Sequence, residues 1–117
     1  VQVQPENLRI CHHNAAALFK GCDVVCECLD APDAKAELVD ALLEDLPGTP
    51  VVAASGMAGY ASANEIRTRK AFGRLYLCGD GATAAQPGQG LMAPRVTVCA
   101  AHQANMALRL LLGLQEV

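Results

Sequence analysis

The stretch that decides the fold is CDVVCECLDAPDAKAELVDALLEDLPGTPVVAAS, residues 22–55. Within it, residues 23–29 form a compact apolar run that is typical of a buried parallel strand. Pro32 then begins an amphipathic helix that we expect to run to about Leu46, where a Pro-Gly pair ends it. A second apolar run covers residues 50–55. The order strand, helix, strand predicts a right-handed unit with two parallel strands.

The segments that follow extend this unit. Residues 65–71 and 75–78 are joined through a glycine turn and predict an antiparallel hairpin at a sheet edge. Residues 79–90 are rich in glycine and predict a loop, and a long helix begins at Ala93. The expected fold class is therefore α/β: a partial doubly wound, Rossmann-like sheet with a parallel βαβ unit, an antiparallel edge hairpin and a long C-terminal helix.

Both ends of the chain also contain sequence patterns that predict secondary structure. Residues 1–4 predict a short strand or an extended lead-in, and Asn14 is expected to cap a short helix over residues 15–20 that Gly21 ends. In the last helix, which Gly113 ends, we expect one buried apolar face and one polar face. The apolar face contains Val96, Ala100, Ala104, Ala107 and Leu111, and the polar face contains Arg95, His102, Asn105 and Arg109.

Composition excludes several classes of protein. The formal net charge of −3 and the pI near 5.5 argue against nucleic acid as a partner, because a sequence-independent binder needs a basic face. The last helix is long enough to span a bilayer, but its charged residues argue against a membrane span. The start of the chain shows no secretory signal. The six cysteines show no disulfide framework, which favours reduced thiols in a cytoplasmic protein.

Asp30 lies where the first apolar run gives way to the helix that begins at Pro32. In an open parallel sheet, ligands bind beyond the carboxyl ends of the strands, which is where this carboxylate is expected. Its hard oxygen atoms suit Mg²⁺ held against nucleotide phosphates. The same carboxylate can cap the helix, with Asp33 adding favourable charge, and the local pattern alone favours the cap.

The thiols offer one candidate nucleophile. No C-x-x-C pair occurs among the six cysteines, so the usual spacing of a zinc site is absent. We expect Cys26, Cys28 and Cys99 to be buried structural residues, because free cysteine is commonly interior. Cys78 ends a predicted strand just before the glycine-rich loop, where an exposed thiol with a lowered pKa would be reactive.

The motif GDGATA, residues 79–84, has the form G-x-G-x-x-A of a dinucleotide-binding fingerprint. Its context differs, because no helix is predicted to follow it and no acidic residue lies about 20 positions further on. We therefore interpret this motif as part of a mobile loop.

The stretch RTRKAFGR, residues 67–74, gathers four basic side chains in an otherwise acidic chain: Arg67, Arg69, Lys70 and Arg74. Such a cluster can receive an acidic partner or a phosphate. The simpler interpretation is the solvated face of an edge hairpin that charge protects from further pairing. His102 is likewise interpreted as a satisfied or exposed side chain of the last helix and not as a catalytic base.

Four phrases together resemble the ThiF-type sulfur-carrier adenylyltransferases of the ubiquitin-activating-enzyme superfamily. They are CDVVCECLDAPDAKAELVDALL, VVAASGMAGY, RLYLCGDG and GLMAPRVTVCAAHQANMALRLLLG, and they cover nearly the whole chain. The combination of the four phrases in this order is much more specific than any single phrase. Within the family, the chain most resembles the shorter ThiF-like proteins of thiamine biosynthesis.

The resemblance implies an enzyme that binds ATP and Mg²⁺ and adenylates the C-terminal Gly-Gly carboxylate of a ThiS-like sulfur carrier protein. In this family the Asp that closes the strand matched by Leu29 and Asp30 lies at the ATP and Mg²⁺ site. The resemblance thus changes the interpretation of Asp30 from helix cap to ligand, and the two roles need not exclude each other. The superfamily commonly dimerises, so the resemblance also implies a homodimer. We expect the carrier tail to enter a channel lined by Gly56, Gly59, Gly79 and Gly81, although among the proposed site residues only Asp30 matches a family position.

Several family features are absent from this sequence. The glycine-rich nucleotide loop, the ribose-binding acid and the phosphate-binding Arg and Lys of the family precede the matching residues, so the chain resembles the C-terminal half alone. We expect residues 1–117 by themselves to be catalytically inactive. Some members form a covalent link to the carrier through a Cys in the segment that corresponds to residues 79–94, which has none here and leaves Cys78 as the nearby candidate.

Two alternatives to this function stay open. The chain can be a non-catalytic Rossmann-like module for binding or dimerisation, with the last helix and the hairpin as its interface. It can also be the distal half of a nicotinamide dehydrogenase, for which His102 is the one weak candidate acid or base.

Overall fold

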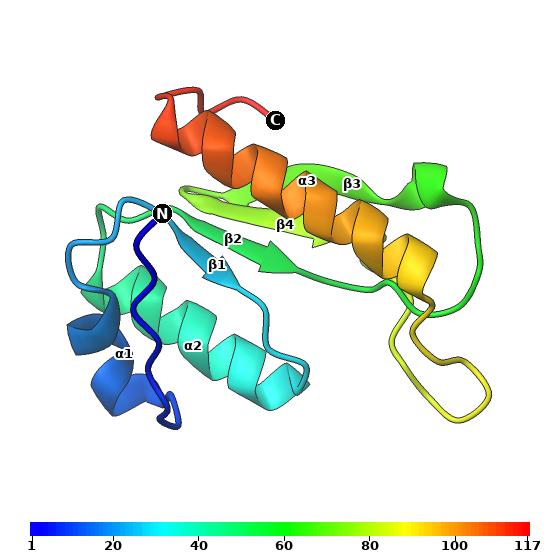
Figure 1. Ribbon diagram of the computed structural model, residues 1–117, viewed down its shortest axis with the longest axis horizontal. Helices are drawn as coiled ribbons and strands as arrows, with labels where there is room; N and C mark the ends of the chain where they lie inside the picture. The colour runs from blue at the N-terminus through cyan, green and yellow to red at the C-terminus, as the bar shows by residue number, and fades with distance from the viewer.

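Four strands and three α-helices make up the fold in the computed structural model, which describes residues 1–117 (Figure 1). In chain order the elements are α1 (His12–Phe19), β1 (Val25–Glu27), α2 (Pro32–Asp45), β2 (Val51–Ala54), the 3₁₀ turn η1 (Ala63–Glu65), β3 (Arg67–Phe72), β4 (Leu75–Gly79) and α3 (Ala93–Leu111). The predicted βαβ unit, hairpin, loop and C-terminal helix are all present.

The four strands form one mixed sheet in the order β1-β2-β4-β3. β1 pairs in parallel with β2, and β2 pairs in parallel with β4, with Val25 opposite Val51 and Val51 opposite Leu75. β3 is antiparallel to β4 and places Arg67 opposite Gly79. The expected α/β class, with a parallel unit and an antiparallel hairpin at one edge, is confirmed.

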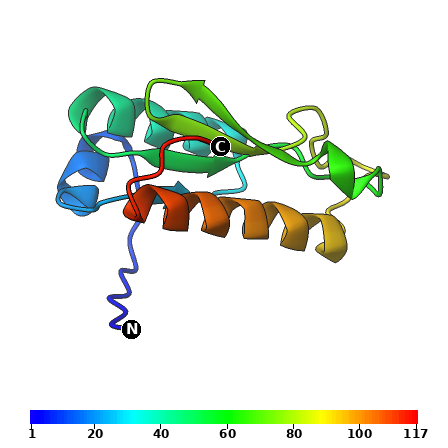
Figure 2. The ribbon, with the colours of Figure 1, turned by 90° about the horizontal axis from the view of Figure 1, so that it is seen from above.

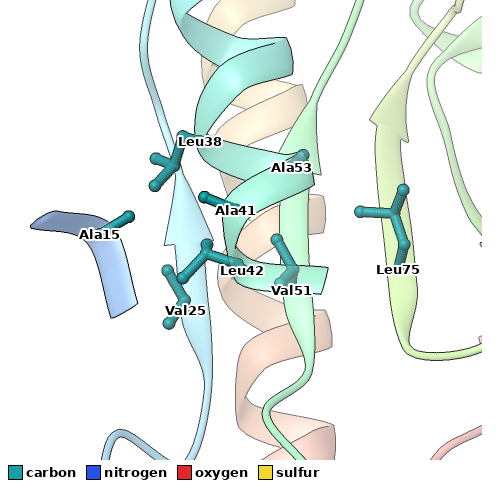
Figure 3. Close-up of a cluster of buried hydrophobic side chains, with 8 residues drawn as sticks. All are labelled: Ala15, Val25, Leu38, Ala41, Leu42, Val51, Ala53 and Leu75. Atoms are coloured by element: carbon teal, nitrogen blue, oxygen red, sulfur yellow. The ribbon is translucent and has the colours of Figure 1, made fainter. Parts of the chain in front are cut away.

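The helices cover the two faces of the sheet. Figure 2 shows α3 on one face and α2 on the other, with α1 beside α2. Under α2 lies a cluster of small and branched side chains that includes Leu38, Leu42, Val51 and Leu75 (Figure 3). A second cluster under α3 contains Val52, Ile66, Tyr76, Cys78, Cys99 and Met106. Residues that alternate along β2 and β4 thus contribute to opposite cores, as the period of a strand requires.

Helix α3 buries a different face from the one that its hydrophobic pattern predicted. Its buried residues are Arg95, Cys99, Gln103 and Met106, while Ala100, Ala104 and Leu111 of the predicted apolar face are exposed. Gln103 can be buried because its Nε2 donates hydrogen bonds to the carbonyl oxygens of Glu27 and Val52 at 2.9 and 2.8 Å. No helix of the fold is both long and apolar enough to cross a membrane.

Strand β1 is shorter than expected, and its side chains are more exposed to solvent. Its burial alternates, with Val25 and Glu27 buried on the side of α2 and Cys26 exposed on the other side, because α3 covers little of this end strand. Cys28 is exposed as well, so the prediction that Cys26 and Cys28 are buried is wrong, whereas the same prediction for Cys99 is confirmed.

The first helix begins earlier than expected. α1 starts at His12 with Cys11 in the N-cap position, so the prediction of Asn14 as the cap is wrong. Asn14 occupies the third helical position, from which its Oδ1 accepts a hydrogen bond from the Cys11 backbone N–H at 2.8 Å. This is the reciprocal half of a capping box. Residues 1–4 form no strand and are an extended lead-in.

Candidate functional site

The carboxyl ends of β1, β2 and β4 lie at one edge of the sheet, because these three strands are mutually parallel (Figure 1). Three connecting segments leave this edge: the turn at residues 28–31, the segment at residues 55–62 and the loop at residues 80–92. Open parallel sheets bind their ligands at this edge. It is therefore the candidate functional site.

The segments after β2 and β4 are held together by backbone hydrogen bonds. The N–H of Ser55 donates to the Cys78 carbonyl at 2.8 Å, and the N–H of Asp80 donates to the Gly56 carbonyl at 2.9 Å. Further along, the N–H of Gly59 donates to the Gly90 carbonyl at 2.9 Å. The two glycine-rich segments thus run side by side, and we call them the paired loops (residues 55–62 and 79–92).

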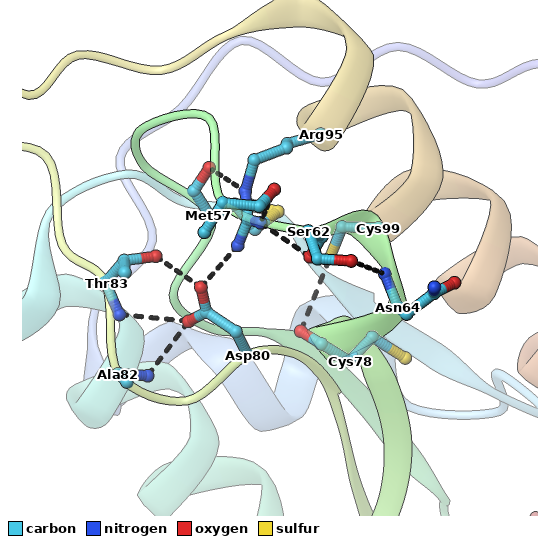
Figure 4. Close-up of polar contacts among 10 residues, drawn as sticks. Met57, Ser62, Asn64, Cys78, Asp80, Ala82, Thr83, Arg95 and Cys99 are labelled. Atoms are coloured by element: carbon cyan, nitrogen blue, oxygen red, sulfur yellow. Dashed lines mark hydrogen bonds and ion pairs between the residues drawn. The ribbon is translucent and has the colours of Figure 1, made fainter.

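A buried ion pair fixes the paired loops to α3. Nη2 of Arg95 lies 2.5 Å from Oδ2 of Asp80, and both side chains are 4% exposed (Figure 4). Nη1 of the same guanidinium donates to the carbonyl oxygens of Ala61 and Ser62 at 2.6 and 2.9 Å. One side chain from the first turn of α3 therefore holds both loops.

The carboxylate of Asp80 is satisfied on both oxygens. Oδ1 accepts from the backbone N–H groups of Ala82 and Thr83, each at 2.9 Å, and Oδ2 accepts from the Thr83 hydroxyl (Figure 4). Burial by itself would raise the pKa of Asp80, but these hydrogen bonds and the Arg95 charge outweigh it and hold the pKa below its ordinary value. Asp80 is thus a fixed anion that shapes the loop.

Asp30 is exposed at the start of the turn into α2. The N-cap position of α2 is Ala31, and no side chain caps this helix, so the interpretation of Asp30 as a helix cap is wrong. Magnesium in proteins commonly takes one or two carboxylates and completes its coordination with water and substrate phosphates. No cluster of three or more His, Cys, Asp or Glu side chains is arranged to hold a metal, so a metal at Asp30 would have to be of this shared kind.

Cys78 lies inside the sheet, and the expectation of an exposed thiol there is wrong. Its side chain is fully buried because β4 is an interior strand covered by α3. Burial raises the pKa of Cys78, and the hydrogen bond with the Thr68 hydroxyl only partly opposes this. A buried thiol with a raised pKa is poorly suited to nucleophilic attack.

The four glycines singled out from the sequence all lie in the paired loops. Gly56, Gly59, Gly79 and Gly81 all have positive φ angles, which other residues rarely adopt. A β-carbon on Gly56 would overlap the Asp80 carboxylate, and one on Gly81 would crowd the Arg69 guanidinium. Close contact between the loops therefore depends on Gly56, Gly59 and Gly79, and Gly81 allows contact with β3. Asp30 lies in the separate turn after β1.

Sequence reasoning missed four residues near this edge. Asp80 was included only in a loop motif, and Arg95 was assigned to the solvent face of its helix; Glu27 and Lys35 were given no role. The local signal for Asp80 was present, since an Asp followed by Gly is typical of a turn in which the Asp side chain accepts backbone hydrogen bonds.

Comparison with protein families gives a match along the entire chain. The sequence model of the ThiF family matches residues 1–117. The chain belongs to the ThiF family. This E1-like family consists of ATP-binding adenylating enzymes. A comparison with curated protein sequences gave no significant match.

The fold of this ThiF-family chain is similar to a solved structure. That crystal structure contains E. coli tRNA N6-threonylcarbamoyladenosine dehydratase, TcdA, in complex with ATP, and the TM-score is 0.65. At 13% sequence identity, the similarity shows a shared fold alone. The match covers 89% of this chain and 54% of TcdA, so the chain spans about half the length of that protein.

Proposed function

We propose that this chain is the C-terminal, carrier-docking half of an ATP-dependent adenylyltransferase that activates a ThiS-like sulfur carrier protein for thiamine biosynthesis. The observation that carries the proposal is the common edge at which an exposed aspartate, Asp30, and the paired loops follow three parallel strands. Membership of the ThiF family supports adenylation as the chemistry.

In the proposed reaction a terminal carboxylate oxygen of the carrier attacks the α-phosphorus of ATP. The new bond joins this oxygen to phosphorus, the bond to the bridging oxygen breaks, and pyrophosphate leaves. Rate enhancement would come from positioning and charge neutralisation, with no protein nucleophile needed. The burial of Cys78 agrees with a route that uses none.

Each segment of the edge has a proposed role. Asp30 would hold Mg²⁺ together with nucleotide phosphate, and the metal would supply positive charge against the phosphates. The paired loops, with Gly56, Gly59, Gly79 and Gly81, would line the channel for the carrier tail, because they follow β2 and β4 at the edge where open parallel sheets bind their ligands. The glycine-rich nucleotide loop of the family precedes the residues that match this chain, so another segment would hold the nucleotide phosphates.

Carrier-dependent ATP–pyrophosphate exchange by the full-length protein tests this proposal. We expect Asp30→Asn to abolish exchange while carrier binding and the melting temperature stay unchanged. Asp33→Asn is the matched control, because it removes the same charge from an exposed position three residues further on. Equal exchange by the native protein, Asp30→Asn and Asp33→Asn would show that Asp30 is not part of the site. No exchange by the native protein with any carrier would contradict adenylation.

One observation favours a binding or dimerisation module as the second candidate. The end of α3 and the residues after it expose several leucines: Leu108, Leu111, Leu112 and Leu114. Exposed apolar patches commonly mark interaction surfaces, and a homodimer is compatible with either function. A pure module would show no response to ATP and Mg²⁺ in the full-length protein, whereas the proposed enzyme would show ATP-dependent carrier modification.

A further inference from the structure

Glu27 carries a carboxylate that is entirely buried at the end of β1. Its Oε1 accepts a hydrogen bond from the backbone N–H of Leu29 at 2.5 Å. The ammonium of Lys35, from the first turns of α2, lies 3.1 Å from Oε1 and 2.9 Å from Oε2. A charged pair thus joins the end of β1 to the start of α2.

Lys35 also holds the backbone directly. Its Nζ donates to the Leu29 carbonyl oxygen at 2.5 Å, and its side chain is 25% exposed. The same Nζ also donates to Oε1 of Glu27, so one ammonium group binds both the carboxylate and the backbone.

These contacts fix the peptide groups on both sides of Leu29. Glu27 binds the N–H of the peptide before Leu29, and Lys35 binds the carbonyl of the peptide that joins Leu29 to Asp30. Because each peptide group is planar, a fixed Leu29 carbonyl also fixes the backbone nitrogen and Cα position of Asp30. The buried pair therefore determines where the Asp30 side chain begins.

The pair is poorly explained as a stabiliser of the fold. Removing two charges from water is costly, and well-packed apolar replacements of a buried ion pair are often neutral or stabilising. Oε2 of Glu27 is buried and makes no well-aligned hydrogen bond, although Lys35 is close to it. An incompletely satisfied charge inside a small domain calls for a role other than stability.

We propose that Glu27 and Lys35 are positioning residues that hold the turn carrying Asp30 in the geometry needed to bind a divalent cation. This inference rests on the proposed function, since it assigns Asp30 to a metal. Partners that orient a metal-binding carboxylate typically change metal affinity or activity by about 10–100-fold when they are lost.

The first test uses the full-length protein with the double substitution Glu27→Met and Lys35→Met, which removes both charges at similar volume. We expect the protein to fold with a similar melting temperature, while the Mg²⁺ concentration for half-maximal ATP–pyrophosphate exchange rises about 10-fold or more. The single substitution Lys35→Arg keeps the charge, so it should raise this Mg²⁺ concentration less than the double substitution does. Asp40→Asn, an exposed carboxylate on the same helix, is the charge control and should change nothing.

A second test reads the turn and the cation without catalysis. Amide hydrogen exchange of Leu29 should become faster in the double variant, and Mn²⁺ binding in the presence of ATP, followed by electron paramagnetic resonance, should weaken by a similar factor. If native protein lacks carrier-dependent exchange, the proposed function fails and these two measurements still decide the positioning role. Unchanged Leu29 exchange and Mn²⁺ affinity would overturn that role.

One further outcome would also overturn it. If Lys35→Met raises the KM for ATP at saturating Mg²⁺ and Glu27→Gln does not, Lys35 contacts the nucleotide itself. The positioning role instead requires both variants to act chiefly through the Mg²⁺ requirement, because both residues hold the same peptide groups.

Discussion

Gly79 and Ser55 approach so closely that a β-carbon on Gly79 would overlap the carbonyl oxygen of Ser55. Gly79 ends β4, the Ser55 backbone continues β2, and the Ser55 N–H donates to the Cys78 carbonyl at 2.8 Å. Gly79 also has a φ angle of 140°, which side chains rarely permit. The entrance to the paired loops is therefore built on a contact that only glycine allows.

We predict that Gly79→Ala destabilises the protein by about 3 kcal/mol or more, because backbone strain and overpacking each cost about 1–3 kcal/mol. Urea denaturation measures the change. Gly90→Ala is the matched control from the same loop, since its β-carbon would meet nothing within 4 Å and its φ angle is not positive. Equal stability of the two variants would show that the close contact with Ser55 is absent.

The ion pair between Asp80 and Arg95 predicts a pH dependence of stability. Burial alone would raise the pKa of Asp80, but hydrogen bonds and Arg95 lower it below the ordinary value of 3.8. A lowered folded-state pKa stabilises the protein above the unfolded-state value, and this contribution is lost as pH falls through the folded-state pKa. Asp80 therefore contributes fully at neutral pH and progressively less below about pH 4.

We expect Asp80→Asn to cost about 3 kcal/mol at neutral pH, because it leaves the Arg95 guanidinium buried without its counter-charge. The difference from the native protein should shrink as the pH falls below the ordinary carboxyl value and through the lowered folded-state pKa, where the native carboxylate becomes protonated. Thermal melts over this pH range measure it. A difference that is constant with pH would mean that Asp80 does not titrate in the folded protein with a lowered pKa.

How much the sequence could predict depends on the kind of interaction. The βαβ unit and the hairpin follow from local patterns, because apolar runs, Pro32 and the glycine turn each act over a few residues. The buried face of α3 does not follow from such patterns. Arg95 and Gln103 are polar, yet they face the sheet because its loop and strand carbonyls accept their hydrogen bonds.

The candidate site shows the same division. Asp30 could be placed at the carboxyl edge from strand order alone, and the glycines at positions 56, 59, 79 and 81 could be assigned to loops. The pairing of Glu27 with Lys35 and of Asp80 with Arg95 could not be predicted, because each pair joins different elements. The exposure of Cys26 likewise depends on β1 being an end strand, which a buried-strand pattern does not reveal.

Thiol reactivity gives a prediction for the cysteines. Cys22, Cys26 and Cys28 are exposed, whereas Cys78 and Cys99 are buried. Burial raises the pKa of Cys78, and burial followed by the nearby Cys78 raises the pKa of Cys99 to about 11. Partial burial, followed by the nearby Cys28, also raises the pKa of Cys26. Because the thiolate is the reactive form, iodoacetamide at neutral pH should label Cys22 and Cys28 first and Cys26 more slowly, and should leave Cys78 and Cys99 unmodified.

Mass spectrometry of the labelled protein measures this pattern. In denaturant all six cysteines should react, which controls for any intrinsic difference between the peptides. Rapid labelling of Cys78 in the native protein would contradict its burial and would support the nucleophile hypothesis again.

Arg74 belongs by sequence to the basic cluster of the hairpin, yet its side chain binds the end of α2. Its Nη2 donates to the carbonyl oxygens of Leu42 and Leu43 at 3.0 and 2.8 Å, and its Nε donates to the Thr49 carbonyl at 2.8 Å. The first two are among the last carbonyls of α2, and that of Leu42 also accepts a hydrogen bond from the Leu46 N–H at 3.1 Å. Arg74 lies in the turn between β3 and β4 and therefore caps the C-terminal end of α2 from the hairpin.

We expect Arg74→Ala to destabilise the protein by about 2 kcal/mol, because hydrogen bonds to a charged group are worth about 1.5–3 kcal/mol and water replaces some of them. Arg67→Ala provides the comparison, since Arg67 is exposed on β3 and should stay within about 0.5 kcal/mol of the native protein. Urea denaturation of both variants decides between the two interpretations of the cluster. Similar small effects of both substitutions would support the interpretation of Arg74 as a solvated side chain of the hairpin. The expected difference would show that Arg74 connects the hairpin to α2.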